Sequence, residues 1–145
     1  MGAAGPEAER STSPRDREWD LRDPEHEVPD RLLTIADAAL ERNARDGLVL
    51  DLRGLSDATD YFVLLSGDSD THARAIARNV RERLEEEDGE TPAGVEGESA
   101  GRWILMDYID LVVHVFLPRV REFYQLERLW GDAPRAPLAE PTGEG

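Results

Sequence analysis

The stretch GRWILMDYIDLVVHVF, residues 101–116, holds two apolar runs joined by a very short connection. Trp103–Tyr108 and Leu111–Phe116 are rich in β-branched and aromatic residues, and only Ile109 and Asp110 separate them. This arrangement predicts a tight antiparallel β-hairpin. Because side chains alternate between the faces of a strand, the first strand presents two sets: Trp103, Leu105 and Asp107 on one face, and Ile104, Met106 and Tyr108 on the other.

Further strands are predicted on the N-terminal side of this hairpin. Leu48–Leu52 is a short apolar run, and Tyr61–Ser66 is almost wholly apolar, which is typical of a central strand covered on both faces. The residues around Val95, with Gly94 and Gly97 on either side of Val95-Glu96, predict one more brief strand.

Three helices complete the predicted fold. The first begins at Pro29-Asp30 and ends at Gly47, and the second is capped by Ser69 or Asp70. The third starts at Pro118 and carries its apolar residues to Trp130 at helical spacing. The order α-β-β-α-β-β-β-α predicts a mixed α/β fold with a five-stranded mixed sheet flanked by helices.

Composition divides the chain into three parts. Residues 1–28 are polar, acid-rich and contain three prolines, which predicts a disordered acidic arm in which Trp19 is the one candidate docking residue. Residues 29–133 form the folded domain. Residues 134–145 are rich in Pro and Gly and are predicted to be a disordered tail.

The charge and cysteine content exclude several classes of function. The chain has 145 residues with 17 basic and 32 acidic side chains, a net charge of −15, and no cysteine. A disulfide scaffold, a thiol nucleophile and thiolate metal sites are excluded. We expect no direct sequence-specific nucleic acid binding, since the charge opposes attraction to phosphate, and no membrane span. All basic residues are arginine, which fits a GC-rich genome or, the interpretation we favour, a salt-rich cytoplasm.

Candidate catalytic chemistry rests on carboxylates. Asp68 and Asp70, with Asp107 as a third carboxylate, are the residue types that hold magnesium for nucleotidyl transfer. Helix capping by Ser69 and Asp70 explains the first two better, because no basic cluster for phosphate accompanies them. His72 and His114 lack a third ligand at metal spacing, and we expect His114 to be a hydrogen-bonded structural residue. The sequence therefore predicts no catalytic residue, metal or cofactor.

Protein binding is the better-supported alternative. Trp and Tyr are the residues that most often dominate protein interfaces. Trp103, beside the polar turn 98–102, is predicted to be an exposed anchor, with Tyr124 and Trp130 added by the last helix. Phe116 and Phe123 are predicted to be core.

Several blocks of residues, in the same order along the chain, are similar to one known family. They are Asp57-x-x-Asp60-Tyr61-Phe62-Val63, Ser66-Gly67-x-Ser69, Ala75-Ile76-Ala77, Gly94-Val95-Glu96-Gly97, Gly101-x-Trp103-Ile104-Leu105-x-Asp107-Tyr108, Val113-His114-Val115-Phe116, and Arg121-x-Phe123-Tyr124-x-Leu126-Glu127-x-Leu129-Trp130. The resemblance covers about residues 30–133. The chain resembles the ribosomal silencing factor family, also called Iojap-like.

The resemblance implies a fold related to that of nucleotidyl transferases, without their activity. It implies a cytoplasmic factor that binds protein fourteen of the large ribosomal subunit and blocks joining of the small subunit, which represses translation under nutrient limitation. Homodimers are also expected. The family's contact positions correspond to Trp103, Leu105, Asp107, Tyr108 and Tyr124. A divergent nucleotidyl transferase and a dimeric scaffold with another protein partner stay open as alternatives.

Overall fold

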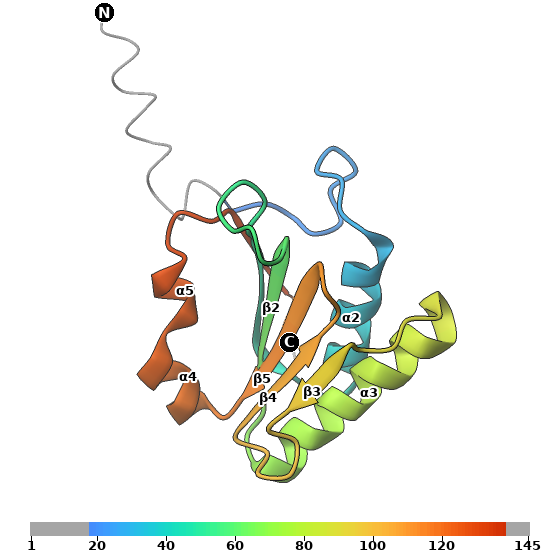
Figure 1. Ribbon diagram of the computed structural model, residues 1–145, viewed down its shortest axis with the longest axis vertical. Helices are drawn as coiled ribbons and strands as arrows, with labels where there is room; N and C mark the ends of the chain where they lie inside the picture. The colour runs from blue at the N-terminus through green and yellow to red at the C-terminus, as the bar shows by residue number, and fades with distance from the viewer. Residues whose placement is uncertain (1–17, 139–145) are drawn as a thin grey trace, which may run out of the picture.

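The computed structural model describes residues 18–138 and has one mixed sheet with helices on both faces (Figure 1). The sheet has six strands in the order β3-β4-β5-β2-β1-β6. The strands are β1 (Arg45–Asp51), β2 (Tyr61–Ser66), β3 (Gly94–Glu96), β4 (Trp103–Asp107), β5 (Leu111–Phe116) and β6 (Arg135–Pro137). The helices are α2 (Asp30–Glu41), α3 (Asp70–Asp88), α4 (Pro118–Tyr124) and α5 (Leu126–Leu129).

The predicted mixed α/β class and the hairpin are both confirmed. Strands β4 and β5 pair antiparallel from Trp103↔Phe116 to Asp107↔Val112. The centre of the sheet is the parallel pair of β2 and β5, and each of the other pairs is antiparallel. Because β2 lies between two strands near the centre of the sheet, its side chains are almost all buried, as its apolar composition predicts.

Helices α2 and α3 cover one face of the sheet, and the short helices α4 and α5 lie on the other (Figure 1). Apolar residues of α2 and α3 such as Ile35, Ile76 and Leu84 form the larger core with Val63 and Val113. A smaller core on the opposite face holds Leu50, Leu52, Leu64, Phe116 and Ala133. The second face is therefore only partly covered.

Helix α3 begins as the sequence predicts. The Ser69 hydroxyl accepts a hydrogen bond from the backbone N–H of His72, and Gly89 ends the helix in the left-handed conformation at φ 65°. A carboxylate oxygen of Asp70 accepts the N–H of Thr71 at 2.8 Å. Helix capping thus accounts for the residues at this helix start.

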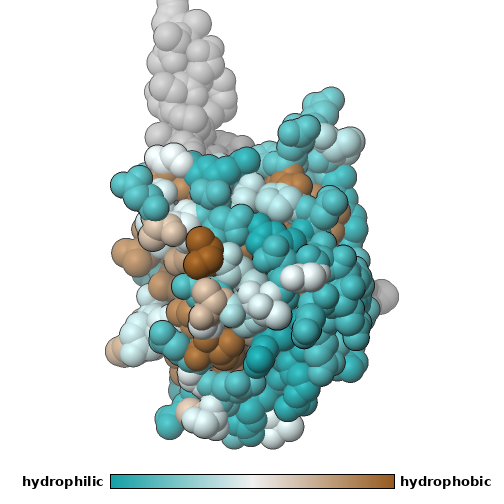
Figure 2. Space-filling view, turned by 45° about the vertical axis from the view of Figure 1, so that its right-hand side comes forward, coloured by the Kyte–Doolittle hydropathy of each residue, from teal (hydrophilic) through white to brown (hydrophobic). Residues whose placement is uncertain are grey.

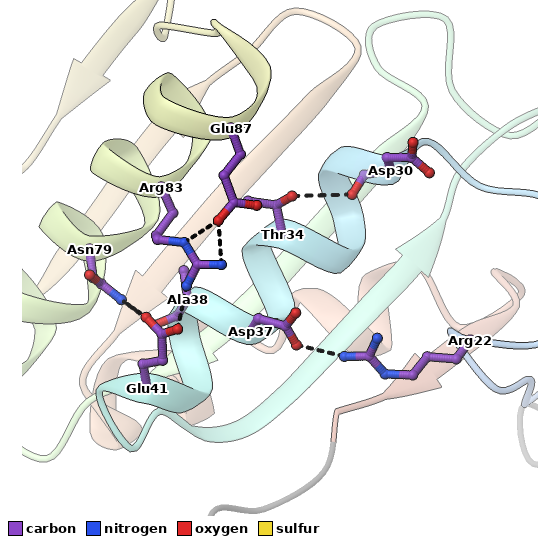
Figure 3. A network of polar contacts seen from close by, with 9 residues as sticks. All are labelled: Arg22, Asp30, Thr34, Asp37, Ala38, Glu41, Asn79, Arg83 and Glu87. Atoms are coloured by element: carbon purple, nitrogen blue, oxygen red, sulfur yellow. Dashed lines mark hydrogen bonds and ion pairs between the residues drawn. The ribbon is translucent and has the colours of Figure 1, made fainter.

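Polar contacts join α2 to α3 along their exposed edge (Figure 3). Arg83 forms ion pairs with Glu41 and Glu87, and the Asn79 amide donates to the carbonyl of Ala38 at 2.8 Å.

Within residues 18–138, no helix is long and apolar enough to cross a bilayer.

Two predicted helix boundaries are wrong. Helix α2 ends at Glu41, and Gly47 lies within β1, because Asn43 at φ 60° reverses the chain earlier. The predicted last helix is two helices, since Gln125 takes a left-handed conformation at φ 49° between α4 and α5.

The predicted arm and tail are too long, and the sheet has six strands instead of five. Residues 134–138 include β6, which pairs antiparallel with β1. In the predicted arm, the N–H of Trp19 donates to the carbonyl of Arg135 at 3.0 Å, and Leu21 is buried in the larger core. The two segments cover the β1 side of the sheet, where unpaired backbone groups would otherwise remain. The rest of both predictions, residues 1–17 and 139–145, lies outside the described residues.

Candidate protein-binding face

Trp103 lies on the partly covered face of the sheet, at the start of β4. Its ring centroid is 4.8 Å from that of Tyr124 on α4 and 5.1 Å from that of Phe116 on β5. The indole N–H donates to Nδ1 of His114 at 3.1 Å. Trp103 is half-buried and Tyr124 is 53% exposed. The two rings therefore form a pair that is held on the sheet side by His114 and Phe116 and is exposed to solvent on the other side.

His114 holds this arrangement from the centre of β5. Its ring packs edge-on against Phe62 at 4.6 Å and is stacked near Phe116 at 5.7 Å. Burial lowers the pKa of His114 to about 4. The imidazole is therefore neutral at physiological pH, and Nδ1 accepts the indole hydrogen bond while the proton is on Nε2. The predicted hydrogen-bonded structural histidine is confirmed.

A groove of about 480 Å³ continues the same face beyond His114. Apolar side chains of Phe62, Leu105, Val112 and Trp130 line it, and Ile109 lies at the hairpin turn beside it. The charged residues that line it, Glu96 and Asp107, are both acidic. The groove therefore offers an apolar surface next to negative charge.

Exposed large apolar side chains gather around the same part of the molecule. Among residues 18–138 they are Leu55, Ile109, Phe123, Tyr124 and Leu129, and Phe123 is 79% exposed. Figure 2 shows hydrophobic residues concentrated on one side of the view and a mostly hydrophilic surface on the other. Exposed apolar surface of this kind is typical of interaction sites. We define the docking face as Trp103, Leu105, Asp107, Tyr124 and the residues that line the groove.

Four of the five predicted contact residues lie on the docking face, and Tyr108 does not. The alternation of β4 directs Tyr108 to the opposite face, where it is 4% exposed and belongs to the larger core. Burial raises the pKa of its phenol to about 12. Phe123, predicted to be core, is exposed instead, because α4 buries its Arg121 side and a residue two positions further along a helix points to the opposite side.

Three residues that line the groove, Phe62, Val112 and Ile109, are not predicted as contact residues from the sequence. Phe62 and Val112 are neighbours across the parallel β2–β5 pair. That long-range pairing leaves no local sequence signal. The alternation within β5 does place Val112 and His114 on one face, and it was the available clue.

The structure does not assemble the three carboxylates of the alternative enzyme hypothesis. Asp68 and Asp70 follow the end of β2, whereas Asp107 pairs with Val112 beside the start of β2. The length of the central strand therefore separates them. Asp70 is also paired with Arg74 at 3.5 Å. Across residues 18–138, no group of three His, Cys, Asp or Glu side chains is arranged to hold a metal ion.

These features define a mixed α/β domain with an aromatic face that its own helices leave partly open. Residues 25–144 match the model of the family described as "Ribosomal silencing factor during starvation". The chain belongs to the ribosomal silencing factor family.

Known relatives agree with this assignment. Ribosomal silencing factor RsfS of Bacillus subtilis is 44% identical over 108 residues, which are 74% of this chain and 91% of that protein. "Mitochondrial assembly of ribosomal large subunit protein 1" of Mus musculus is 34% identical over 92 residues, 62% of this chain and 40% of that protein. The crystal structure of protein CV0518 from Chromobacterium violaceum has a TM-score of 0.68 at 34% identity, covering 72% of this chain and 87% of that one.

Proposed function

We propose that this protein binds the large ribosomal subunit in the cytoplasm through ribosomal protein fourteen. The bound domain occupies space that the small subunit needs, and it thereby represses translation when nutrients are limiting. The observation that carries the proposal is the docking face, with the Trp103–Tyr124 pair at one end and the apolar groove at the other. The relative named for assembly of the ribosomal large subunit supports this choice of partner.

The energetics of the docking face favour binding. Tyr124 and Ile109 keep large apolar surfaces in water, and a partner that covers them gains about 25 cal/mol for each Å² of apolar surface buried. Trp103 is already held by His114 and Phe116, so little side-chain entropy is lost when a partner binds. Aromatic residues fixed in this way are typical interface hot spots.

The charge distribution is compatible with an RNA-rich partner. Residues 117–138, which include α4 and α5, carry four arginines against three acidic residues, in a chain with a net charge of −15. Two residues of the docking face, Tyr124 and Trp130, lie in this segment, whereas Glu96 and Asp107 bring negative charge to the groove. Approach beside α4 and α5 meets less repulsion from ribosomal phosphate than the net charge of the whole chain implies, and salt screens the remainder.

Silencing by exclusion requires no reaction. The fraction of large subunits blocked depends on the concentration of the factor relative to its Kd. A homodimer is also part of the proposal. Dimers that use the docking face would compete with the ribosome for it.

The test uses purified bacterial large subunits and the full-length chain. We expect the protein to co-sediment with large subunits and, when added before small subunits, to reduce the yield of joined ribosomes. Addition after joining should have a smaller effect, because the site is then covered. The proposal would be contradicted if the protein failed to co-sediment with large subunits at every salt concentration tested.

A further inference from the structure

Ile109 has a backbone conformation that its side chain disfavours. It lies at the tip of the β4–β5 hairpin with φ at 76°, in the left-handed region. The other non-glycine residues with positive φ among residues 18–138 are Asn43, Asp46 and Gln125. These are polar and unbranched at Cβ, whereas a β-branched residue at positive φ is a genuine outlier.

The surrounding contacts prevent the turn from relaxing. A carboxylate oxygen of Asp107 accepts the N–H of Ile109 at 2.8 Å, and the N–H of Asp110 donates to the carbonyl of Tyr108 at 2.9 Å. The Asp110 carbonyl accepts from Asp60 at 2.8 Å, and its carboxylate is paired with Arg31. Strained backbone persists where neighbouring contacts fix it on both sides in this way.

Within the domain, the Ile109 side chain makes few buried contacts that could offset the energetic cost of this strained backbone conformation. It is 67% exposed to solvent, and glycine would take the same φ without a steric penalty. Its exposed side chain instead extends the apolar lining of the groove, next to Leu105 and Val112. Strained positions of this kind occur preferentially at functional sites.

We infer that Ile109 is an anchor of the docking face, contacting an apolar side chain of the large-subunit protein that occupies the groove. This inference rests on the proposed function. Since both charged residues that line the groove, Glu96 and Asp107, are acidic, the contacting segment of the partner pairs that apolar side chain with a basic one.

The test compares Ile109→Gly, Ile109→Asn and Ile109→Leu in the full-length chain. Glycine and asparagine tolerate positive φ, so we expect each to raise the Tm, by about 3–6 °C for glycine. Both remove the apolar contact, and we expect binding to purified large subunits to weaken by about 5- to 50-fold. Leucine keeps an apolar side chain, and its affinity should stay within about threefold of the original protein.

The opposite changes in stability and binding distinguish an anchor from a merely structural residue. If Ile109→Gly is more stable and binds as tightly as the original protein, while Trp103→Ala loses binding, Ile109 is not an anchor and the proposed function stands. If Ile109→Gly is less stable, the turn is not strained and the inference is overturned. If the original protein does not bind large subunits, the proposed function itself has failed.

Discussion

The buried imidazole of His114 is expected to make the stability of the domain depend on pH. In the folded protein the pKa of His114 is about 4, against the ordinary value of 6.5 that applies to the unfolded chain. Between these values the unfolded state binds a proton that the folded state does not. The contribution of neutral His114 to the stability of the domain is therefore complete above pH 6.5 and is lost as the pH falls toward 4.

The expected size of this effect follows from the gap between the two pKa values. A gap of about 2.5 pH units corresponds to about 3 kcal/mol, which is a large part of the stability of a small domain. Protonation in the folded state, which begins only near pH 4, also removes the acceptor for the indole N–H of Trp103, so acid weakens the support of the docking face.

The assay is urea unfolding at intervals from pH 4 to pH 7, followed by far-UV circular dichroism. His114→Asn keeps an acceptor close to the Nδ1 position and cannot ionise. We expect this variant to be less stable overall and to show a shallower loss of stability below pH 6.5, with the carboxylate contribution common to both proteins. Identical slopes for the two proteins would show that His114 does not cause this pH dependence.

Two further changes test contacts at the N-terminal segment and at the start of β4. Deletion of residues 1–28 removes buried Leu21 and the Trp19 ring that is stacked 3.8 Å from His26, so we expect the free energy of unfolding in urea to fall by about 2–4 kcal/mol. Deletion of residues 1–17 alone is the control, and equal stability of the two truncated proteins would contradict the packing of this segment. Gly97, at φ 79°, has no room for a side chain: Gly97→Ala would place a Cβ 2.0 Å from the carbonyl oxygen of Trp103, so we expect the free energy of unfolding to fall by more than about 2 kcal/mol. Gly54→Ala is the control, because Gly54 has a similar φ of 83° but open space around it; equal losses of stability in the two variants would rule out the clash.

Local patterns predicted the elements that lie at the centre of the fold. The alternation of Trp103, Leu105 and Asp107, the two-residue connection and the Ser69 cap are all short-range signals, and the structure has each of them. The same alternation already placed Tyr108 on the opposite face. Its assignment to the contact set came from the family resemblance and not from the residues.

Long-range and edge features could not be predicted in the same way. Strand β6 is the three-residue segment Arg-Ala-Pro, which has no strand period and is ordered only by pairing with β1. The segment around Trp19 and Leu21 is polar on average, and its two apolar residues find cover only because β6 and α2 are adjacent. The groove depends on the parallel pairing of β2 with β5.

Binding of the large subunit through the docking face is tested by the affinity of Trp103→Ala and Tyr124→Ala for purified large subunits, with thermal unfolding measured on the same samples. An interface aromatic contributes about 2–4 kcal/mol, so we expect binding to weaken about 30- to 1,000-fold for Trp103→Ala. Tyr124 is 53% exposed, and its variant should lose binding with little change in Tm. Tyr108→Phe, on the buried face, is the matched control and should bind normally. Normal binding by a folded Tyr124→Ala and Trp103→Ala would contradict the account.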